Sequence, residues 1–179
     1  MTKVLIETDR LILKPVGLEH CTPAYVSWLN DAATTKYLET GRTKTTIEDL
    51  KTFIESIDHS KQVFLAIHDK STQKHIGNIK LHNLLAEHAR VDYGILMGDK
   101  LSWGKGYAKE ASIGIINHAF NKMNVRRIVL GVLDANESAV HLYRKLGFTQ
   151  EGTLRKDRLC DGKYHDCFIF GLLKEEWKF

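Results

Sequence analysis

Two glycines flank a single lysine in the stretch Trp103-Gly104-Lys105-Gly106-Tyr107-Ala108. The stretch follows an apolar, strand-like run and precedes a helical pattern, so we predict a turn that opens a helix. Such a turn presents several backbone N–H groups at the positive end of the helix, where phosphate oxygens bind well. The spacing matches neither the G-x-G-x-x-G of dinucleotide-binding loops nor the G-x-x-x-x-G-K-[ST] of nucleotide P-loops. The residues by themselves leave open a phosphate-binding turn of another kind and an ordinary strand-to-helix turn.

A second stretch of interest runs from Asn136 to Phe148 and reads N-E-S-A-V-H-L-Y-R-K-L-G-F. In this order, the two stretches resemble the two hallmark motifs of the GNAT acetyltransferases, Q/R-x-x-G-x-G/A and N-x-x-A/S-x-x-x-Y-x-K-x-G-F. Trp103 departs from the Gln or Arg that is usual in the first motif, but backbone groups do the binding there. Tryptophan at this position and the segments 25–31 and 35–39 are similar to the ribosomal-protein-alanine N-acetyltransferase branch of the family.

The resemblance implies acetyl-CoA as cosubstrate and no metal. It implies that the glycine loop binds pyrophosphate through backbone N–H groups and that the strand before it offers backbone groups to the pantetheine arm. Two tasks fit Asn136, which can cap the following helix and contact the cofactor arm. Lys109, just after the loop, either helps to bind phosphate or faces solvent. The implied cofactor-binding residues are Ile95, Leu96, Met97, Trp103, Gly104, Lys105, Gly106, Tyr107, Ala108, Asn136, Ser138, Tyr143, Arg144 and Lys145.

The implied catalytic residues are Tyr143 and Asn136. Acetyl transfer to an amine needs a polarised carbonyl, a neutral amine and a proton for the departing thiolate. Tyr143 resembles the tyrosine proposed as the general acid in this family. A phenol has a pKa of about 10, so it keeps its proton at neutral pH, and general acid catalysis contributes about 10²–10⁴-fold in rate. The alternative is an aromatic ring packed between Leu142 and Leu146.

The general base has no motif of its own. An amine like that of lysine is only about 0.04% neutral at pH 7, whereas an α-amine is about 10% neutral, so a lysine-like acceptor needs a base far more. Asp92, Glu39, His82 and Glu7 are candidates from their expected places in the fold. Each carboxylate could equally be a solvated surface charge, and a chain of water molecules would leave no trace in the sequence.

The acceptor pocket in the resembled family is built largely by the first two helices and the loop between them, here about residues 28–49. Candidate acceptor-binding residues are Trp28, Tyr37, Glu39, His82 and Asp92, with Trp28 alternatively in the core. We expect the acceptor to be a protein N-terminal amine, with a nucleotide-linked amino sugar or a polyamine as the alternative. A non-catalytic acyl-CoA-binding module is the rival hypothesis from another functional class.

These motifs need a fold that brings them together, and hydrophobic periodicity predicts its elements. The expected order is strand, two helices, three strands, helix, strand, helix and two strands. This order predicts an α/β (α+β mixed) fold with three layers around a central mixed, mostly antiparallel sheet, as in the GNAT fold. The predicted helices are 18–29, one starting at 46, 106–123 and one from 136 to near 147; the predicted strands are 11–15, 63–68, 75–81, 90–97, 126–133, 148–154 and 164–173.

Composition limits the broad class of the protein. The 179 residues suit one domain, 1–179, and a hydrophobic content of 43% with 27% charged residues is typical of a soluble globular chain. The net charge of +4 is scattered, so we expect neither a nucleic-acid nor a membrane partner, although a homodimer is compatible. Three cysteines without C-x-x-C, and the lack of a signal peptide, favour the cytoplasm. Nine histidines include no H-E-x-x-H, so no metal site is expected.

Overall fold

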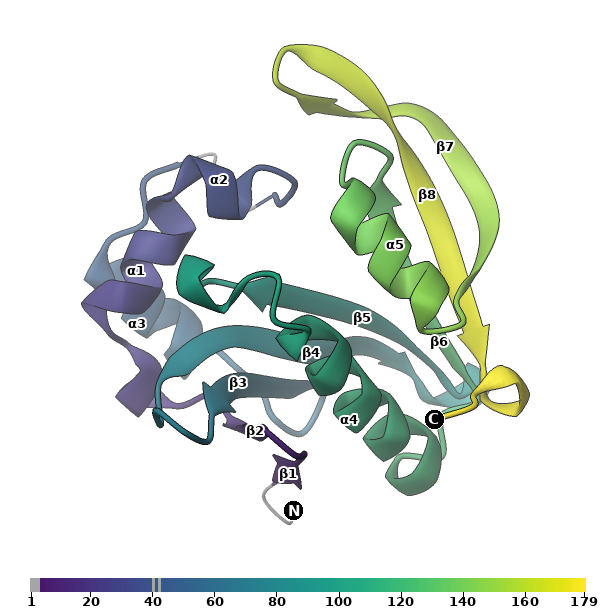
Figure 1. Cartoon of the computed structure of the whole chain (residues 1–179), viewed down its shortest axis with the longest axis horizontal. Helices are drawn as coiled ribbons and strands as arrows, with labels where there is room; N and C mark the ends of the chain where they lie inside the picture. The colour runs from purple at the N-terminus through teal and green to yellow at the C-terminus, as the bar shows by residue number, and fades with distance from the viewer. Residues whose placement is uncertain (1–3, 40, 42) are drawn as a thin grey trace.

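The fold is built on one eight-stranded sheet in the order β1-β2-β3-β4-β5-β6-β8-β7. The computed structural model describes residues 4–39, 41 and 43–179. Neighbouring strands are antiparallel except β5 and β6, which are parallel (Figure 1). The strands are β1 (Ile6–Glu7), β2 (Leu11–Pro15), β3 (Val63–Asp69), β4 (His75–Leu85), β5 (Arg90–Met97), β6 (Arg127–Leu133), β7 (Thr149–Cys160) and β8 (Lys163–Leu173).

Helices cover both faces of the sheet, which gives the predicted three layers. The α-helices are α1 (Pro23–Asn30), α2 (Ala32–Thr35), α3 (Ile47–Glu55), α4 (Tyr107–Lys122) and α5 (Glu137–Lys145). Alternation along β3 separates the two cores: Leu65 and Ile67 pack with α4 and α5, whereas Phe64 and Ala66 pack with α1 and α3. The predicted mixed, mostly antiparallel α/β architecture is therefore confirmed.

The sheet opens between its two parallel strands. Residues Arg90–Asp92 of β5 pair with Arg127–Val129 of β6, and the pairing then stops. Beyond that point β5 continues to Met97 against β4 alone, while β6 continues to Leu133 against β8 alone. In Figure 1 the two halves of the sheet diverge on either side of α5. The backbone edge of β5 that would face β6 is thereby left free of a strand.

The helix predicted over 18–29 is broken in the structure, which is a correction to the sequence-based expectation. Residues Leu18–His20 form a short 3-10 helix, and α1 starts only at Pro23. The cause is local: Pro23 has no N–H to donate, so it suits the first turn of a new helix rather than the interior of a long one. Thr22 caps the new helix by accepting a hydrogen bond from the Tyr25 N–H.

Other element predictions hold with changed lengths. Thr46 caps α3 in a capping box with Asp49, as its spacing indicates. The hairpin β7–β8 and the strand β4 extend further than predicted, while the short elements α2 and β1 were not predicted. Within the described ranges, no helix has the length and apolar character that crossing a membrane requires.

Candidate active site

An open cleft of about 1690 Å³ lies where the sheet splits. Its walls come from α2 and the loop after it, from β4, β5 and β6, from the glycine loop before α4, and from α5. The hairpin β7–β8 contributes residues near its tip. Both predicted motifs therefore face one space, although most of α4 and the strand β6 separate them in sequence.

The glycine loop has the backbone conformation that only glycine adopts easily. Gly104 has φ +73° and Gly106 has φ +79°. Gly106 is the N-cap of α4 and offers no side-chain cap, so the first N–H groups of that helix are left for another acceptor. A Cβ on Gly104 would meet nothing within 4 Å, so open space lies beside the loop. Free donors, helix polarity and open space together fit the pyrophosphate of a coenzyme A molecule.

Neighbouring elements hold this loop in place through residues that sequence reasoning missed. Arg10 donates from Nη1 to the Lys105 carbonyl at 3.0 Å and from Nε to Glu110 Oε2 at 2.7 Å. The Tyr107 hydroxyl donates to Asp69 Oδ2 at 2.9 Å. These contacts join the bend before β2, the end of β3 and the start of α4, which no local sequence pattern connects.

Trp103 fixes the loop to the end of β5. Its indole Nε1–H donates to the Met97 carbonyl at 2.9 Å, while 44% of the residue stays exposed. A tryptophan in place of the usual Gln or Arg thus has a structural task in this chain, because it binds the loop to the neighbouring strand.

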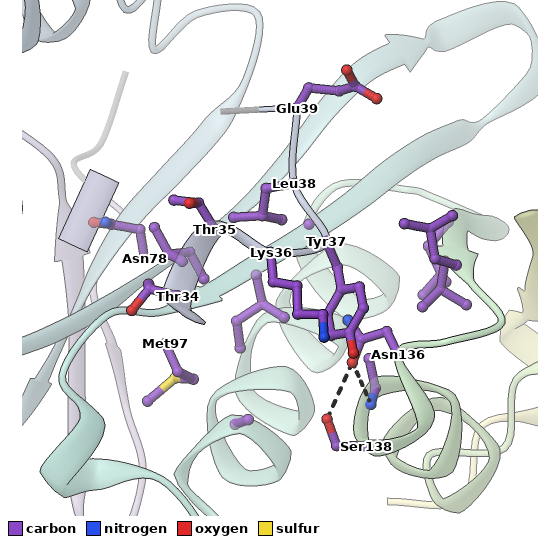
Figure 2. Close-up of a pocket in the computed structure, with 18 of the residues that line it drawn as sticks. Thr34, Thr35, Lys36, Tyr37, Leu38, Glu39, Asn78, Met97, Asn136 and Ser138 are labelled. Atoms are coloured by element: carbon purple, nitrogen blue, oxygen red, sulfur yellow. Dashed lines mark hydrogen bonds between the residues drawn. The ribbon is translucent and has the colours of Figure 1, made fainter. Parts of the chain in front are cut away.

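Asn136 is the N-cap of α5, as its position predicts. Its Oδ1 accepts hydrogen bonds from the Ala139 N–H at 3.3 Å and from the Ser138 hydroxyl at 3.1 Å. Because capping uses only the oxygen, the Nδ2 donor remains for the cleft that Asn136 lines. Figure 2 shows Lys36 and Tyr37 reaching across toward Asn136 and Ser138.

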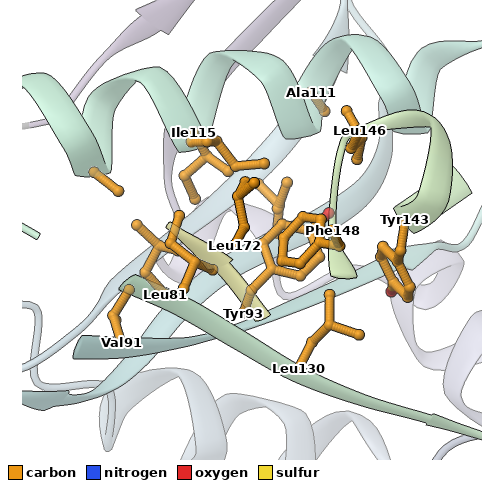
Figure 3. Close-up of a cluster of buried hydrophobic side chains, with 14 of the residues drawn as sticks. Leu81, Val91, Tyr93, Ala111, Ile115, Leu130, Tyr143, Leu146, Phe148 and Leu172 are labelled. Atoms are coloured by element: carbon orange, nitrogen blue, oxygen red, sulfur yellow. The ribbon is translucent and has the colours of Figure 1, made fainter. Parts of the chain in front are cut away.

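Tyr143 is held in place by an aromatic cluster. The residue is 7% exposed, and its ring lies 6.0 Å from that of Tyr93 and 5.8 Å from that of Phe148 (Figure 3). Burial raises the pKa of Tyr143 to about 12. Its hydroxyl has no hydrogen-bond partner among the described residues, and the residue lines the cleft. The packing and the functional interpretation of Tyr143 are therefore compatible.

Comparison with known proteins decides the family. The model of the acetyltransferase (GNAT) domain matches residues 10–149. The chain belongs to the GNAT acetyltransferase family. It is 27% identical over 172 residues to the uncharacterized N-acetyltransferase YoaA of Bacillus subtilis, covering 95% of this chain and 97% of that protein. It is 29% identical over 102 residues to the putative ribosomal N-acetyltransferase YdaF of the same organism, covering 57% and 55%.

A solved structure shares the fold. The spermidine N-acetyltransferase from Vibrio cholerae, in complex with CoA and spermine, has a TM-score of 0.85 at 22% identity and covers 94% of this chain and 98% of that one. The predicted GNAT fold is confirmed, and the chain is an N-acetyltransferase of this family.

Most residues that the motifs implied for the cofactor line the cleft of this GNAT domain. Lys105 and Arg144 do not: Lys105 is exposed and offers its carbonyl to Arg10, while Arg144 reaches Gln150 Oε1 at 3.4 Å. Lys109 also lines the cleft and lies 5.2 Å above the Phe179 ring. The lining set is Ile95, Leu96, Met97, Trp103, Gly104, Gly106, Tyr107, Ala108, Asn136, Ser138, Tyr143 and Lys145.

The residues proposed for the acceptor fall into two groups. Tyr37, Glu39, His82 and Asp92 line the cleft, whereas Trp28 lies in the core. Trp28 packs so closely on Gly98 that a Cβ there would overlap its indole ring. This close packing between α1 and the end of β5 explains why the tryptophan is absent from the cleft wall.

The candidate bases differ in the hydrogen bonds and ion pairs that their side chains already form. Asp92 accepts from Arg90 at 2.9 Å and from the Asn83 amide at 3.0 Å, and Glu39 is ion-paired with Arg158. Glu7 pairs with Lys70 at 3.2 Å, and it is not among the residues of the cleft wall. His82 faces the cleft from β4, where burial and the nearby Lys80 lower its pKa. His82 is therefore neutral at neutral pH.

Two further residues of the cleft floor were missed. Asn78 and Lys80 precede His82 on β4 at intervals of two and line the cleft with it. The alternation of apolar and polar residues over 77–82 is the signal that could have found them. No cluster of His, Cys, Asp and Glu suited to a metal ion occurs among the residues whose positions are described.

Proposed function

We propose that this enzyme transfers an acetyl group from acetyl-CoA to a primary amine by direct attack within a ternary complex. The observation that carries the proposal is the single cleft shared by the glycine loop, Tyr143 and the polar floor of β4. Both substrates can meet there, because the split of the sheet opens the space between the two motifs. Bound acetyl-CoA would supply the activated acyl group.

The cofactor side would use backbone groups. The N–H groups at the start of α4 would bind the pyrophosphate, with the nearby Lys109 and Lys145 adding positive charge to the cleft. The free edge of β5, around Ile95 and Leu96, would hydrogen-bond the pantetheine arm as a strand would. The Met97 carbonyl is already taken by Trp103, so the arm would use the groups before it.

Tyr143 would hold the proton that the departing thiolate needs. Its pKa of about 12 keeps the hydroxyl protonated at any physiological pH. A phenol of this pKa is a weaker acid than a thiol, so the residue acts mainly as a hydrogen-bond donor at the sulfur. Asn136 would orient the arm with the amide nitrogen that capping leaves unused.

His82 is the best placed base among the candidates. It is neutral, it lines the cleft, and its Nδ1 is buried with no hydrogen-bond partner in the described part of the chain. The carboxylates of Asp92 and Glu39 are already engaged by arginines, so neither is free to take a proton from the amine. His82 would accept the proton of the attacking amine directly or through a water molecule.

The acceptor that family resemblance favours is a protein N-terminal amine, and one relative is named a putative ribosomal N-acetyltransferase. A nucleotide-linked amino sugar and a polyamine are the small-molecule alternatives. An α-amine is partly neutral at pH 7 and needs little help from a base. A lysine-like amine is almost fully protonated and needs a base to remove its proton.

The test follows thiol release from acetyl-CoA against peptides with Ala or Ser at the N-terminus, polyamines and amino sugars. We expect amine-dependent release that falls at least about tenfold in Tyr143→Phe, with acetyl-CoA affinity retained. Tyr164→Phe, which alters an exposed tyrosine on β8, is the matched control. His82→Gln should slow a lysine-like amine more than an α-amine. Binding of acetyl-CoA without release on any amine would support the non-catalytic module instead.

A further inference from the structure

The floor of the cleft carries hydrogen-bond donors on alternate residues of one strand. Asn78, Lys80 and His82 lie on the cleft face of β4, while Ile79 and Leu81 between them are fully buried in the opposite core. This pattern follows from the two-residue period of a strand. The floor is therefore built into the sheet rather than placed on a loop.

Lys80 is a half-buried cation on this floor. Lys80 pairs with Gly94 on the neighbouring strand β5. A Cβ built on Gly94 would lie 3.4 Å from the Cε of Lys80. The missing side chain on β5 thus leaves room for the lysine to lie over that strand. No carboxylate among the described residues pairs with Lys80, and burial lowers its pKa. An anion beside the ammonium would relieve this desolvation.

Asn78 adds a second unused donor. The residue is 3% exposed, and its Oδ1 lies 3.0 Å from His75 Nε2. Its Nδ2 is buried without a hydrogen-bond partner among the described residues. Because a buried unpaired donor is costly, a ligand oxygen at this point would be stabilising. Figure 2 shows Asn78 within the set that lines the cleft.

The carboxylates around the cleft are, in contrast, already engaged. Asp92 is paired with Arg90 and Asp161 with Lys36, each at 2.9 Å, and Glu39 is paired with Arg158. Asp49 accepts from the Thr46 N–H and hydroxyl in the capping box of α3. A polycationic acceptor would have to share these carboxylates with their present partners and would also face Lys80. The cleft is therefore poorly suited to a polyamine.

We infer that the acceptor is an amine that also carries an anionic group, a phosphate or a carboxylate, which Lys80 binds while Asn78 donates to a neighbouring oxygen. This inference rests on the proposed function and names the acceptor class for it. The cation has a second consequence for the reaction. A positive charge near a bound ammonium lowers the pKa of that ammonium, which raises the neutral fraction that can attack.

The experiment compares amines that differ only in the anion. One pair is glucosamine and glucosamine 6-phosphate, and the other is the dipeptide amides Ala-Asn and Ala-Asp, with spermidine as the polycation. The wild type, Lys80→Met and Lys80→Arg are compared with Lys74→Met, which alters an exposed lysine in the turn before β4. We expect at least about a tenfold higher kcat/KM for an anionic member than for its neutral partner.

This preference should disappear in Lys80→Met, return largely in Lys80→Arg and remain in Lys74→Met. The phosphate and carboxylate pairs show which anion is bound. Preferred use of spermidine, or an anion preference that survives in Lys80→Met, would overturn the inference. Equal use and equal binding of both members of each pair would overturn it too.

Calorimetric titration of the same amines into the acetyl-CoA-loaded protein separates this inference from the transferase proposal. Lys80-dependent binding of glucosamine 6-phosphate or the Ala-Asp amide without thiol release would support the anion site and count against catalysis. Amine-dependent release without any anion preference would support catalysis and refute the anion site.

Discussion

At the scale of single residues, a substitution at Gly104 tests the proposed phosphate-binding loop separately from the stability of the fold. Its φ of +73° and the open space beside it predict that Gly104→Ala places a methyl group where the proposed phosphate oxygens would approach. We expect acetyl-CoA affinity to fall by about tenfold, with a loss of about 1 kcal/mol in the free energy of unfolding. Gly162→Ala is the matched control, because Gly162 has φ +74° and equally open surroundings at the tip of the hairpin. Equal acetyl-CoA affinity in the two variants, by titration calorimetry, would contradict the assigned role of the loop.

Buried histidines make folding stability depend on pH. His75 packs against Trp28 with ring centroids 4.9 Å apart, and burial lowers its pKa from 6.5 to about 4. Burial lowers the pKa of His20 and His68 beside it as well. Between pH 6.5 and 4 the unfolded chain therefore binds protons that the folded chain does not. This stability is fully present above pH 6.5 and is lost as the pH falls toward 4.

Urea unfolding at pH 7.5 and pH 5 measures this effect. One pKa unit corresponds to about 1.4 kcal/mol, so we expect the free energy of unfolding to fall by at most a few kcal/mol. The His75→Gln variant should be less stable at pH 7.5 and should lose less on acidification. A wild-type stability that is unchanged at pH 5 would show that these histidines titrate normally.

Sequence patterns found the residues whose roles are carried by motifs and missed those placed by the sheet. Asn136 caps its helix and Tyr143 lines the cleft, because both belong to one short helix that a local pattern describes. Lys80 and Arg10 belong to no motif. Their importance comes from the strands and loops that fold next to them, which a local pattern does not specify.

At the scale of elements, Glu110 connects the start of α4 to the bend between β1 and β2. Its carboxylate accepts from the Thr8 hydroxyl at 2.6 Å and from the Arg10 backbone N–H and Nε, both at 2.7 Å. Glu110→Gln should cost about 1–3 kcal/mol in the free energy of unfolding, because these hydrogen bonds are charge-assisted. It should also weaken acetyl-CoA binding several-fold, because Arg10 then holds the loop less firmly.

Glu55→Gln is the control for that variant. Glu55 forms an exposed pair with Lys51 at 3.9 Å, and such pairs contribute about 0–1 kcal/mol. Chemical denaturation and calorimetric titration of acetyl-CoA measure both effects. If Glu110→Gln behaves like Glu55→Gln in both measurements, the link between α4 and the bend before β2 does not position the loop.

Predictions of helices and strands succeeded where a hydrophobic pattern extends over many residues, and they failed at the ends of elements. The apolar stripe of α4 and the strand β5 match their predicted ranges closely, since burial imposes their periodicity over many residues. The predicted helix over 18–29 failed at Pro23, whose missing N–H outweighs a continuous apolar pattern. The four-residue α2 has too few residues to display a period at all.

At the scale of the whole molecule, the site depends on contacts that no local pattern encodes. The order of elements predicted the sheet, but the split between β5 and β6 arises from where their pairing stops. The size and polarity of the cleft likewise follow from how the loop after α2 meets the hairpin β7–β8. Those segments come from opposite ends of the chain.

Three contacts join the loop after α2 to the hairpin β7–β8 at one side of the cleft. Lys36 Nζ pairs with Asp161 Oδ2 at 2.9 Å, Arg158 pairs with Glu39, and the Cys160 thiol donates to the Lys36 carbonyl at 3.4 Å. The double variant Arg158→Gln/Asp161→Asn removes both ion pairs. Global stability should change by no more than about 1–2 kcal/mol, because each exposed pair contributes about 0–1 kcal/mol. The loop should open more often, so the KM for the acceptor should rise while acetyl-CoA affinity stays within about twofold.

Hydrogen exchange provides a readout that does not need a known acceptor. Amides of residues 35–39 should exchange faster in the double variant, whereas those of α3 should not change. Lys51→Gln, which removes an exposed pair on α3 away from the hairpin, should leave residues 35–39 unaffected. Unchanged exchange over 35–39 in the double variant would mean that these two ion pairs do not hold the loop over the cleft. A faster rate confined to that segment would show that the C-terminal hairpin holds this loop over a cleft built mainly by the rest of the chain.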